Sequence, residues 1–206
     1  MSALHYILTH VSVIGRYTLE HIILVGVSLA IAIAIAYPLG IIAFRKPRLG
    51  VWITGTTGVL YTIPSLALLA ILVVTIGLGF PTAVIALVLY AQMVLVRSVV
   101  TGLRRVDPGI RDAARGLGFT AWQSLLRIEV PAALPVLIGG VRVAAVTLIA
   151  LATLGAWIDA GGLGVLLFEG IHTDDPDRII AGALAAALLA IVVDVALRRV
   201  ERSASS

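Results

Sequence analysis

The chain has no cysteine and only one lysine, Lys46, and these absences exclude several kinds of chemistry. Without cysteine there can be no disulfide, no thiolate metal site and no thiol nucleophile. Lys46 precedes a proline, so the sequence has no Gly-Lys-Ser/Thr loop of the kind that cradles nucleotide phosphates. Any ATP hydrolysis on which this chain depends is therefore expected in a separate subunit.

Other catalytic motifs are missing too. The sequence has neither Gly-x-Ser-x-Gly nor His-Glu-x-x-His, and its four histidines all fall outside the predicted membrane spans. His5, His10 and His21 gather near the N-terminus but lack the paired spacing and further ligand that a metal site needs. We therefore predict no catalytic residue, no metal site and no cofactor in this chain. The net charge of +4 indicates arginines retained on one side of a membrane rather than nucleic-acid binding.

Charged residues are scarce, at 13%, whereas 60% of the 206 residues are apolar. Soluble domains have roughly 45 to 50% apolar residues, so the composition predicts an integral membrane protein with one domain. Five apolar stretches are long enough to cross a hydrocarbon layer of about 30 Å. They are 22–44, 51–75, 80–96, 134–157 and 179–197. The predicted fold class is all-α, a polytopic membrane protein with about five transmembrane helices, and no cleaved signal peptide is expected.

Basic residues divide unequally between the two sides of such a bundle. With the N-terminus outside, all but three of the 15 basic residues fall in the cytoplasmic segments. The exceptions are Arg16 and Arg178 outside and Arg142 within a span, and the external connection over 159–177 is acidic instead. This bias predicts a multi-pass protein with its N-terminus outside and its C-terminus in the cytoplasm.

The segment 107–135 has the pattern of a helix, a glycine turn and a second helix. Asp107 is suited to cap the first helix, which Gly118 is suited to end. Thr120 and Gln123 form a capping box that starts the second helix. Proline then ends the unit, at Pro131 and again at Pro135.

The first of these helices is predicted to be amphipathic. We expect its arginines to be solvated first and to contact a partner second. The pattern by itself also fits a helix pair lying on lipid headgroups. The apolar face would carry Ile110, Ala113, Ala114 and Leu117, and the polar face Arg111, Asp112 and Arg115.

A proline interrupts the second predicted span, at a depth where irregular backbone is tolerated only beside protein or a cavity. The third span carries two polar side chains that are also better hidden from lipid. These features indicate a candidate translocation pathway, for which a plain packed kink is the alternative. Its residues are Tyr61, Thr62, Pro64, Ser65, Tyr90 and Gln92.

Arg142 and Asp194 are charged residues inside predicted spans, where charge is costly. One interpretation makes them a pair that controls a gate near the cytoplasmic end. The other pairs Asp194 with Arg198 at i, i+4 and lets Arg142 snorkel to the interface. We favour the second, because both residues lie toward that interface.

The segment 107–135 resembles the cytoplasmic EAA loop of binding-protein-dependent ABC importer permeases. The signature of that family is Glu-Ala-Ala, three residues, Gly, nine residues and Ile-x-Leu-Pro. The matching residues here are Asp112, Ala113, Ala114, Gly118, Ile128 and Pro131. Aspartate stands for the first glutamate, and Val130 stands for the leucine. The resemblance implies that this loop, with Arg115 inside it, docks on an ATPase subunit and receives its motion.

Three further stretches are similar to the osmoprotectant branch of these permeases, which serves glycine betaine, carnitine or choline. They are TIPSLALLA at 62–70, LVLYAQMVLVRSVVTGL at 87–103 and AGGLG at 160–164. Asp159 stands where that branch usually has glycine. Permeases for methionine share the AGGLG turn and the loop, so methionine or another small solute is the alternative substrate.

The resemblance implies a type I ABC importer permease fold, like that of methionine permeases, in a bacterial or archaeal cytoplasmic membrane. It also implies partners: ABC ATPase subunits that bind ATP and Mg, a second permease subunit, identical or homologous, an extracytoplasmic substrate-binding protein, and membrane lipid. Residues 1–19 are expected to lie in the interface, 20–200 to form the transmembrane domain and 201–206 to be a disordered tail. A secondary transporter or a structural membrane subunit are the alternatives from other classes.

Overall fold

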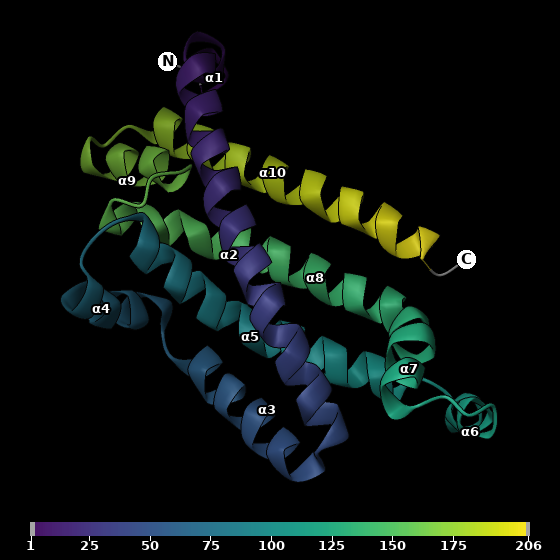
Figure 1. Cartoon of the computed structure of the whole chain (residues 1–206). Helices are drawn as coiled ribbons and strands as arrows, with labels where there is room; N and C mark the ends of the chain where they lie inside the picture. Colours follow the sequence, from purple (N-terminus) through teal and green to yellow (C-terminus); the bar gives the residue numbers. More distant parts are fainter. Residues whose placement is uncertain (1–2, 205–206) are drawn as a thin grey trace.

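The structure, a computed structural model, describes residues 3–204, and within this range the chain is helical with short connections and no strand (Figure 1). The long helices are α2 (Val11–Arg45), α3 (Pro47–Thr62), α5 (Phe80–Arg104), α8 (Val130–Ala152) and α10 (Pro176–Ser203). The shorter ones are α1 (Ala3–Thr9), α4 (Ser65–Ile76), α6 (Pro108–Gly116), α7 (Ala121–Ser124) and α9 (Gly164–His172). A π-helical turn (Leu125–Glu129) precedes α8, and a 3₁₀ segment (Thr153–Ile158) follows it.

Four helical stretches are long and apolar enough to cross a membrane: α2, α5, the run from α7 through the 3₁₀ segment, and α10. The remaining predicted span is split, because α3 and α4 meet at an angle of 95°. Pro64 explains the break, since its ring disfavours helical backbone at the preceding residue, and Ile63 is extended with ψ 127°. The prediction of an all-α membrane protein with about five spans is confirmed, with its second span broken.

The helices extend beyond the predicted spans. α2 begins at Val11, so part of the segment expected in the interface is continuous with the first span. α10 continues to Ser203, which corrects the expected disordered tail over 201–206 as far as that residue, and 205–206 lie outside the described residues. The connection 159–177, which was predicted to be external, contains α9, which the sequence pattern did not indicate. Helices lengthen in this way because each added residue gains a backbone hydrogen bond whether or not it is apolar.

Helix α5 is the centre of the bundle and packs against α2, α3 and α8 (Figure 1). Small residues let its neighbours approach closely. A β-carbon added at Gly140 of α8 would lie 2.2 Å from Ser98 Cβ, and one at Gly40 of α2 would lie 2.5 Å from Val99 Cβ. Such contacts are how transmembrane helices gain van der Waals packing without a hydrophobic driving force between them.

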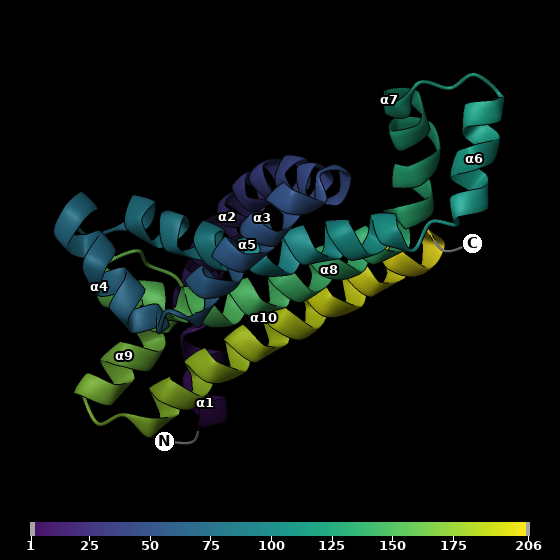
Figure 2. The ribbon, with the colours of Figure 1, turned by 90° about the horizontal axis from the view of Figure 1, so that it is seen from below.

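The two ends of the bundle carry different elements. Figure 2 shows α6 and α7 projecting at one end, beside the C-terminal end of α10, whereas α1, α4 and α9 lie toward the other end. The α2–α3 junction belongs to the α6 end, because the Arg45 guanidinium donates a hydrogen bond to the Ala121 carbonyl. The loop with the family signature and most helix-terminal arginines therefore share one end.

Candidate functional site

Helix α6 is built by local signals in the sequence. The Asp107 carboxylate accepts a hydrogen bond from Gly109 N at 2.7 Å and caps the helix. At the other end Gly118 has φ 81°, a left-handed conformation that glycine adopts without steric cost. Phe119 N then donates to the Ala114 carbonyl at 3.1 Å and closes the helix end. The predicted helix and glycine turn are confirmed.

The second helix begins as predicted but does not end as predicted. Thr120 Oγ1 accepts from Gln123 N at 3.2 Å, and Gln123 Oε1 accepts from Thr120 N at 2.8 Å, which completes the capping box. The expectation that Pro131 and Pro135 end the unit is wrong, because the helical run continues through both. Before Pro131 the chain forms the π turn, in which Val130 N bonds to the Leu125 carbonyl. Pro131 has no N–H to donate to a helical carbonyl, and this wider turn lets the helix continue without that hydrogen bond.

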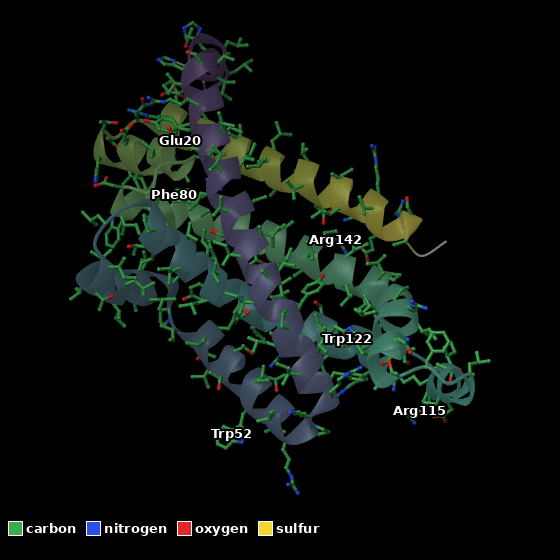
Figure 3. All side chains as sticks on the ribbon, in the orientation of Figure 1. Glu20, Trp52, Phe80, Arg115, Trp122 and Arg142 are labelled. Carbon is green, nitrogen blue, oxygen red and sulfur yellow. The ribbon has the colours of Figure 1, made fainter. Side chains whose placement is uncertain are left out.

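The residues predicted to form the apolar face of α6 are mostly exposed. Ala114 is its buried residue, whereas Ile110 is exposed and Leu117, just beyond the helix, is 77% exposed. Trp122 is 57% exposed, and it and Arg115 are labelled on this end of the molecule in Figure 3. Four large apolar side chains of this segment are exposed, and we call this set the loop surface. Its members are Ile110, Leu117, Trp122 and Leu126.

The residues of the signature lie around this surface. Asp112 and Arg115 form an exposed ion pair at 3.2 Å on α6. Ala113 and Gly118 are exposed, Ala114 is buried, and Ile128 is half-buried in the π turn. The structure therefore brings the signature residues of α6 and the start of α8 together at one end, around exposed apolar side chains.

Arg111 faces inward, contrary to the expectation of a solvated side chain. Its Nη2 donates to the Leu103 carbonyl at 2.5 Å and to the Val106 carbonyl at 3.1 Å. Its guanidinium lies over the Phe44 ring, 5.1 Å from the centroid, and its Nε lies 3.4 Å from Glu129 Oε2. Sequence reasoning did not single out Glu129, although a carboxylate between apolar neighbours was a signal for it.

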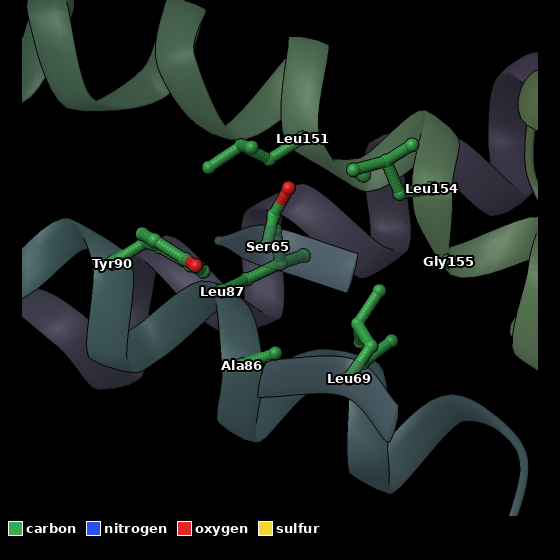
Figure 4. A pocket seen from close by; sticks show the side chains of 10 residues that line it. Ser65, Leu69, Ala86, Leu87, Tyr90, Leu151, Leu154 and Gly155 are labelled. Atoms are coloured by element: carbon green, nitrogen blue, oxygen red, sulfur yellow. The ribbon is translucent and has the colours of Figure 1, made fainter. Parts of the chain in front are cut away.

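The candidate pathway residues divide into two groups. The Tyr90 hydroxyl donates to the Ile63 carbonyl at the α3–α4 break, and the Tyr90 ring meets Tyr61 edge-on at 6.0 Å between centroids. Ser65 lies beside Tyr90 on a small pocket that Leu151 and Leu154 also line (Figure 4). The pocket volume is about 10 Å³, which holds about one water.

The other members of that set lie apart from the pocket. Thr62 and Pro64 are exposed at the break. Gln92 is buried on another face of α5, where its amide donates to the Ala32 carbonyl at 3.4 Å and to the Val88 carbonyl at 3.1 Å. The structure therefore groups Tyr61, Ser65 and Tyr90 and places Gln92 against α2.

The charged residues of α8 and α10 form a network. Arg142 Nη1 lies 2.8 Å from Asp194 Oδ1, and Arg142 Nε lies 2.9 Å from Glu201 Oε2. The favoured interpretation, in which Arg142 snorkels, is wrong, whereas the expected pair of Asp194 with Arg198 is present at 2.5 Å. Arg142 therefore ties α8 to α10 near the α6 end of the bundle.

His21 was predicted to lie outside the membrane spans, and this prediction is wrong. It lies within α2 and is fully buried, so not all histidines fall outside the spans. Its Nδ1 accepts from Leu163 N at 3.3 Å, so its Nε2 carries the proton and donates to the Ile149 carbonyl at 3.0 Å. Among the residues of 3–204, no cluster of His, Asp and Glu is arranged to hold a metal ion.

Comparison with known proteins supports the sequence signature. The family model for the binding-protein-dependent transport system inner membrane component matches residues 26–206. The osmoprotectant import permease protein OsmW of Salmonella typhimurium is 40% identical over 98% of this chain and 96% of its own length. The carnitine transport permease protein OpuCB of Listeria monocytogenes is 39% identical over 89% of this chain and 84% of its own length.

The fold matches solved permeases as well. A chain of the MetNI methionine ABC transporter in an inward-facing conformation superimposes with a TM-score of 0.85, at 21% identity, over 93% of this chain and 95% of the other. The match confirms the fold expected from the resemblance to methionine permeases. The family name implies an ATPase partner and a binding-protein partner, and ATP is not hydrolysed by this chain itself. The chain belongs to the family of inner-membrane permease components of binding-protein-dependent ABC transporters.

Proposed function

We propose that this permease moves a quaternary ammonium osmoprotectant, such as glycine betaine, carnitine or choline, into the cell. The similarity to OsmW and OpuCB over nearly the whole chain is the observation that carries the proposal. The structural likeness to the methionine transporter bears on the fold alone, at 21% identity. Methionine is therefore the alternative substrate that an experiment must exclude.

The loop surface is the proposed docking site of the ATPase subunit, which binds ATP and Mg. It combines four exposed apolar side chains with the Asp112–Arg115 ion pair, as a partner-binding helix requires. Isolated exposed apolar residues are ordinary, but a group of them beside a signature loop marks an interaction site. The signature residues Asp112, Ala113, Ala114, Arg115, Gly118, Ile128 and Pro131 would position this surface.

The α3–α4 break is the proposed lining of the translocation pathway and faces a second permease subunit, either identical or homologous. Pro64 caps α4 without a capping side chain, so N–H groups of its first turn need partners outside the helix. Exposed backbone of this kind at membrane depth requires protein or water beside it. Because the pocket beside Ser65 holds about one water, solute passage requires helix movement or a wall from the second subunit. Gln92 stands outside this lining.

The proposed topology places the N-terminus outside and the α6 end in the cytoplasm. Arg45, Arg104 and Arg115 all lie at that end, and the positive-inside bias supports this orientation. The extracytoplasmic binding protein would then dock at the end with α4 and α9. Family membership sets aside the secondary transporter and the structural subunit.

Uptake by the complete transporter tests the substrate. The chain, its ATPase subunit and its binding protein are expressed together in cells that lack other osmoprotectant importers, and radiolabelled glycine betaine, carnitine, choline and methionine are compared. We expect uptake of at least one quaternary ammonium solute and none of methionine. Uptake of methionine alone would refute the proposed substrate class.

Co-purification tests the docking site. Gly118→Trp places a bulky side chain at φ 81°, and Leu117→Asp puts a charge on the loop surface without changing the backbone. Both variants should insert into the membrane and lose association with the ATPase subunit. Gly15→Trp is the matched control, because a side chain there meets no atom within 4 Å. Unchanged association in both loop variants would refute the docking site.

A further inference from the structure

Glu129 is a buried carboxylate, 6% exposed, at the point where the π turn joins α8. Ser124 Oγ donates to its Oε1 at 3.0 Å, and Arg111 Nε lies 3.4 Å from its Oε2. A carboxylate removed from water is strongly destabilising unless an opposite charge and hydrogen bonds accompany it. Arg111 supplies that charge, so the position of α6 is tied to the start of α8.

Arg111 also binds the membrane helices on either side. Its hydrogen bonds go to the Leu103 carbonyl in the last turn of α5 and to the Val106 carbonyl just beyond that helix, where backbone carbonyls lack the usual α-helical donor. Its contact with the Phe44 ring reaches the last turn of α2. A single guanidinium therefore joins α6 to α2, α5 and α8.

Little else attaches α6 to the bundle. Ala114 is the buried residue of this helix, and its other side chains are exposed or, for Arg111, partly exposed. The chain enters α6 through Val106 and Asp107 and leaves through the glycine turn at Gly118. The polar contacts of the Arg111 guanidinium are thus the main side-chain route by which a displacement of α6 reaches the spans.

We propose that Arg111 and Glu129 form a clamp through which movement of α6 is transmitted to the membrane helices. Arg111 is a positioning residue in this scheme, because it acts through its contacts with Phe44, the Leu103 and Val106 carbonyls and Glu129. The planar guanidinium suits the role, since one fork can hold two carbonyls and a carboxylate in fixed directions, whereas a lysine cannot. The proposal rests on the docking of α6 to the ATPase subunit proposed above.

The π turn explains how Glu129 reaches its position. The π turn at Leu125–Glu129 holds one residue more than an α-helical turn. This extra residue rotates the helix that follows, so that the Glu129 carboxylate points toward Arg111. Single π turns within α-helices are frequent at functional sites. The 3.4 Å contact with Arg111 Nε is not aligned as a hydrogen bond, which leaves room for it to tighten when α6 moves.

The test separates transport from hydrolysis in the complete transporter, reconstituted in liposomes with the binding protein. Arg111→Gln, Arg111→Lys and Glu129→Gln are compared with Arg199→Gln, which removes an exposed arginine of α10. Three quantities are measured for each variant: ATPase subunit bound per permease, ATP hydrolysed, and glycine betaine taken up per ATP.

We expect Arg111→Gln and Glu129→Gln to keep the bound ATPase subunit and its hydrolysis while uptake per ATP falls. The fall should be about ten- to a hundredfold, the factor for one lost hydrogen bond to a charged group. Arg111→Lys should restore part of the uptake, and Arg199→Gln should match the wild type. A merely structural role would lower hydrolysis and uptake together, with the amount of folded complex.

Two results would overturn the clamp: uptake per ATP unchanged in Arg111→Gln and Glu129→Gln, or loss of the bound ATPase subunit in these variants. The second would make Arg111 part of the docking surface instead. Failure of the proposed function looks different, because the wild-type permease itself would then bind no ATPase subunit or take up no quaternary ammonium solute.

Discussion

Replacing His21 by leucine tests whether a buried histidine fixes the first span to the turn before α9 and to α8. The substitution keeps a side chain of similar size but removes both ring nitrogens. The Leu163 N–H and the Ile149 carbonyl would lose partners now at 3.3 Å and 3.0 Å. A buried polar group left without a hydrogen bond costs about 1 to 3 kcal/mol, so the two together should lower the free energy of unfolding by about 2 to 6 kcal/mol.

Thermal unfolding of the purified permease in detergent measures this loss. His172→Leu is the matched control, because His172 is exposed at the end of α9 and its replacement should change the free energy of unfolding by less than about 0.5 kcal/mol. His21→Asn should lie between the wild type and His21→Leu, since an amide can still bond one of the two groups. Equal stability of His21→Leu and His172→Leu would refute this role of His21.

Five further substitutions, at four positions, test the packing and the polar contacts of the spans. Gly140→Ala should destabilise the permease by about 1 to 3 kcal/mol, because its β-carbon would lie 2.2 Å from Ser98 Cβ. Gly26→Ala, where nothing lies within 4 Å, should be neutral or stabilising in the same thermal assay. Tyr90→Phe should cost about 1 to 3 kcal/mol by leaving the carbonyl at the α3–α4 break without its donor. Arg142→Met should insert normally but melt at a lower temperature, with partial recovery in Arg142→Lys, and an unchanged melting temperature in Arg142→Met would argue against the α8–α10 tie.

Features set by neighbouring residues were predictable from the sequence. Asp107 caps α6, Gly118 ends it, and Thr120 with Gln123 starts the next helix, because each depends on a few backbone groups within one turn. The break at Pro64 was predictable for the same reason, since a proline restricts the residue before it whatever surrounds the helix. The number of spans followed from the length and apolarity of the stretches.

Features set by distant contacts were not predictable. The sequence predicted solvated arginines on α6, but Arg111 points toward the bundle, where the Leu103 carbonyl and Glu129 lie close to its guanidinium. His21 bonds to a carbonyl 128 residues further along the chain, and periodicity carries no information about such a contact.

Two other predictions were wrong for different reasons, one a contact between helices and one a local turn. The i, i+4 pair of Asp194 and Arg198 was predictable, but the pairing of Arg142 depended on which face α8 presents to α10. Pro131 was read as a helix end, whereas a π turn lets the helix pass through it. Periodicity did not predict that the side chains of the loop surface are exposed. Only the resemblance to the family signature suggested that this segment contacts a partner.

Cross-linking of the loop surface to the ATP-binding subunit tests the central claim most directly. The chain has no native cysteine, so Leu117→Cys and Ile171→Cys each provide one thiol, at exposed sites at opposite ends of the bundle. In the complete transporter in membranes, Leu117→Cys should cross-link to the ATPase subunit and should not react with membrane-impermeant thiol reagents added outside. Ile171→Cys should react with these reagents and should not cross-link to the ATPase subunit. Labelling of Leu117→Cys from outside, or no cross-link from it in an active transporter, would contradict the account.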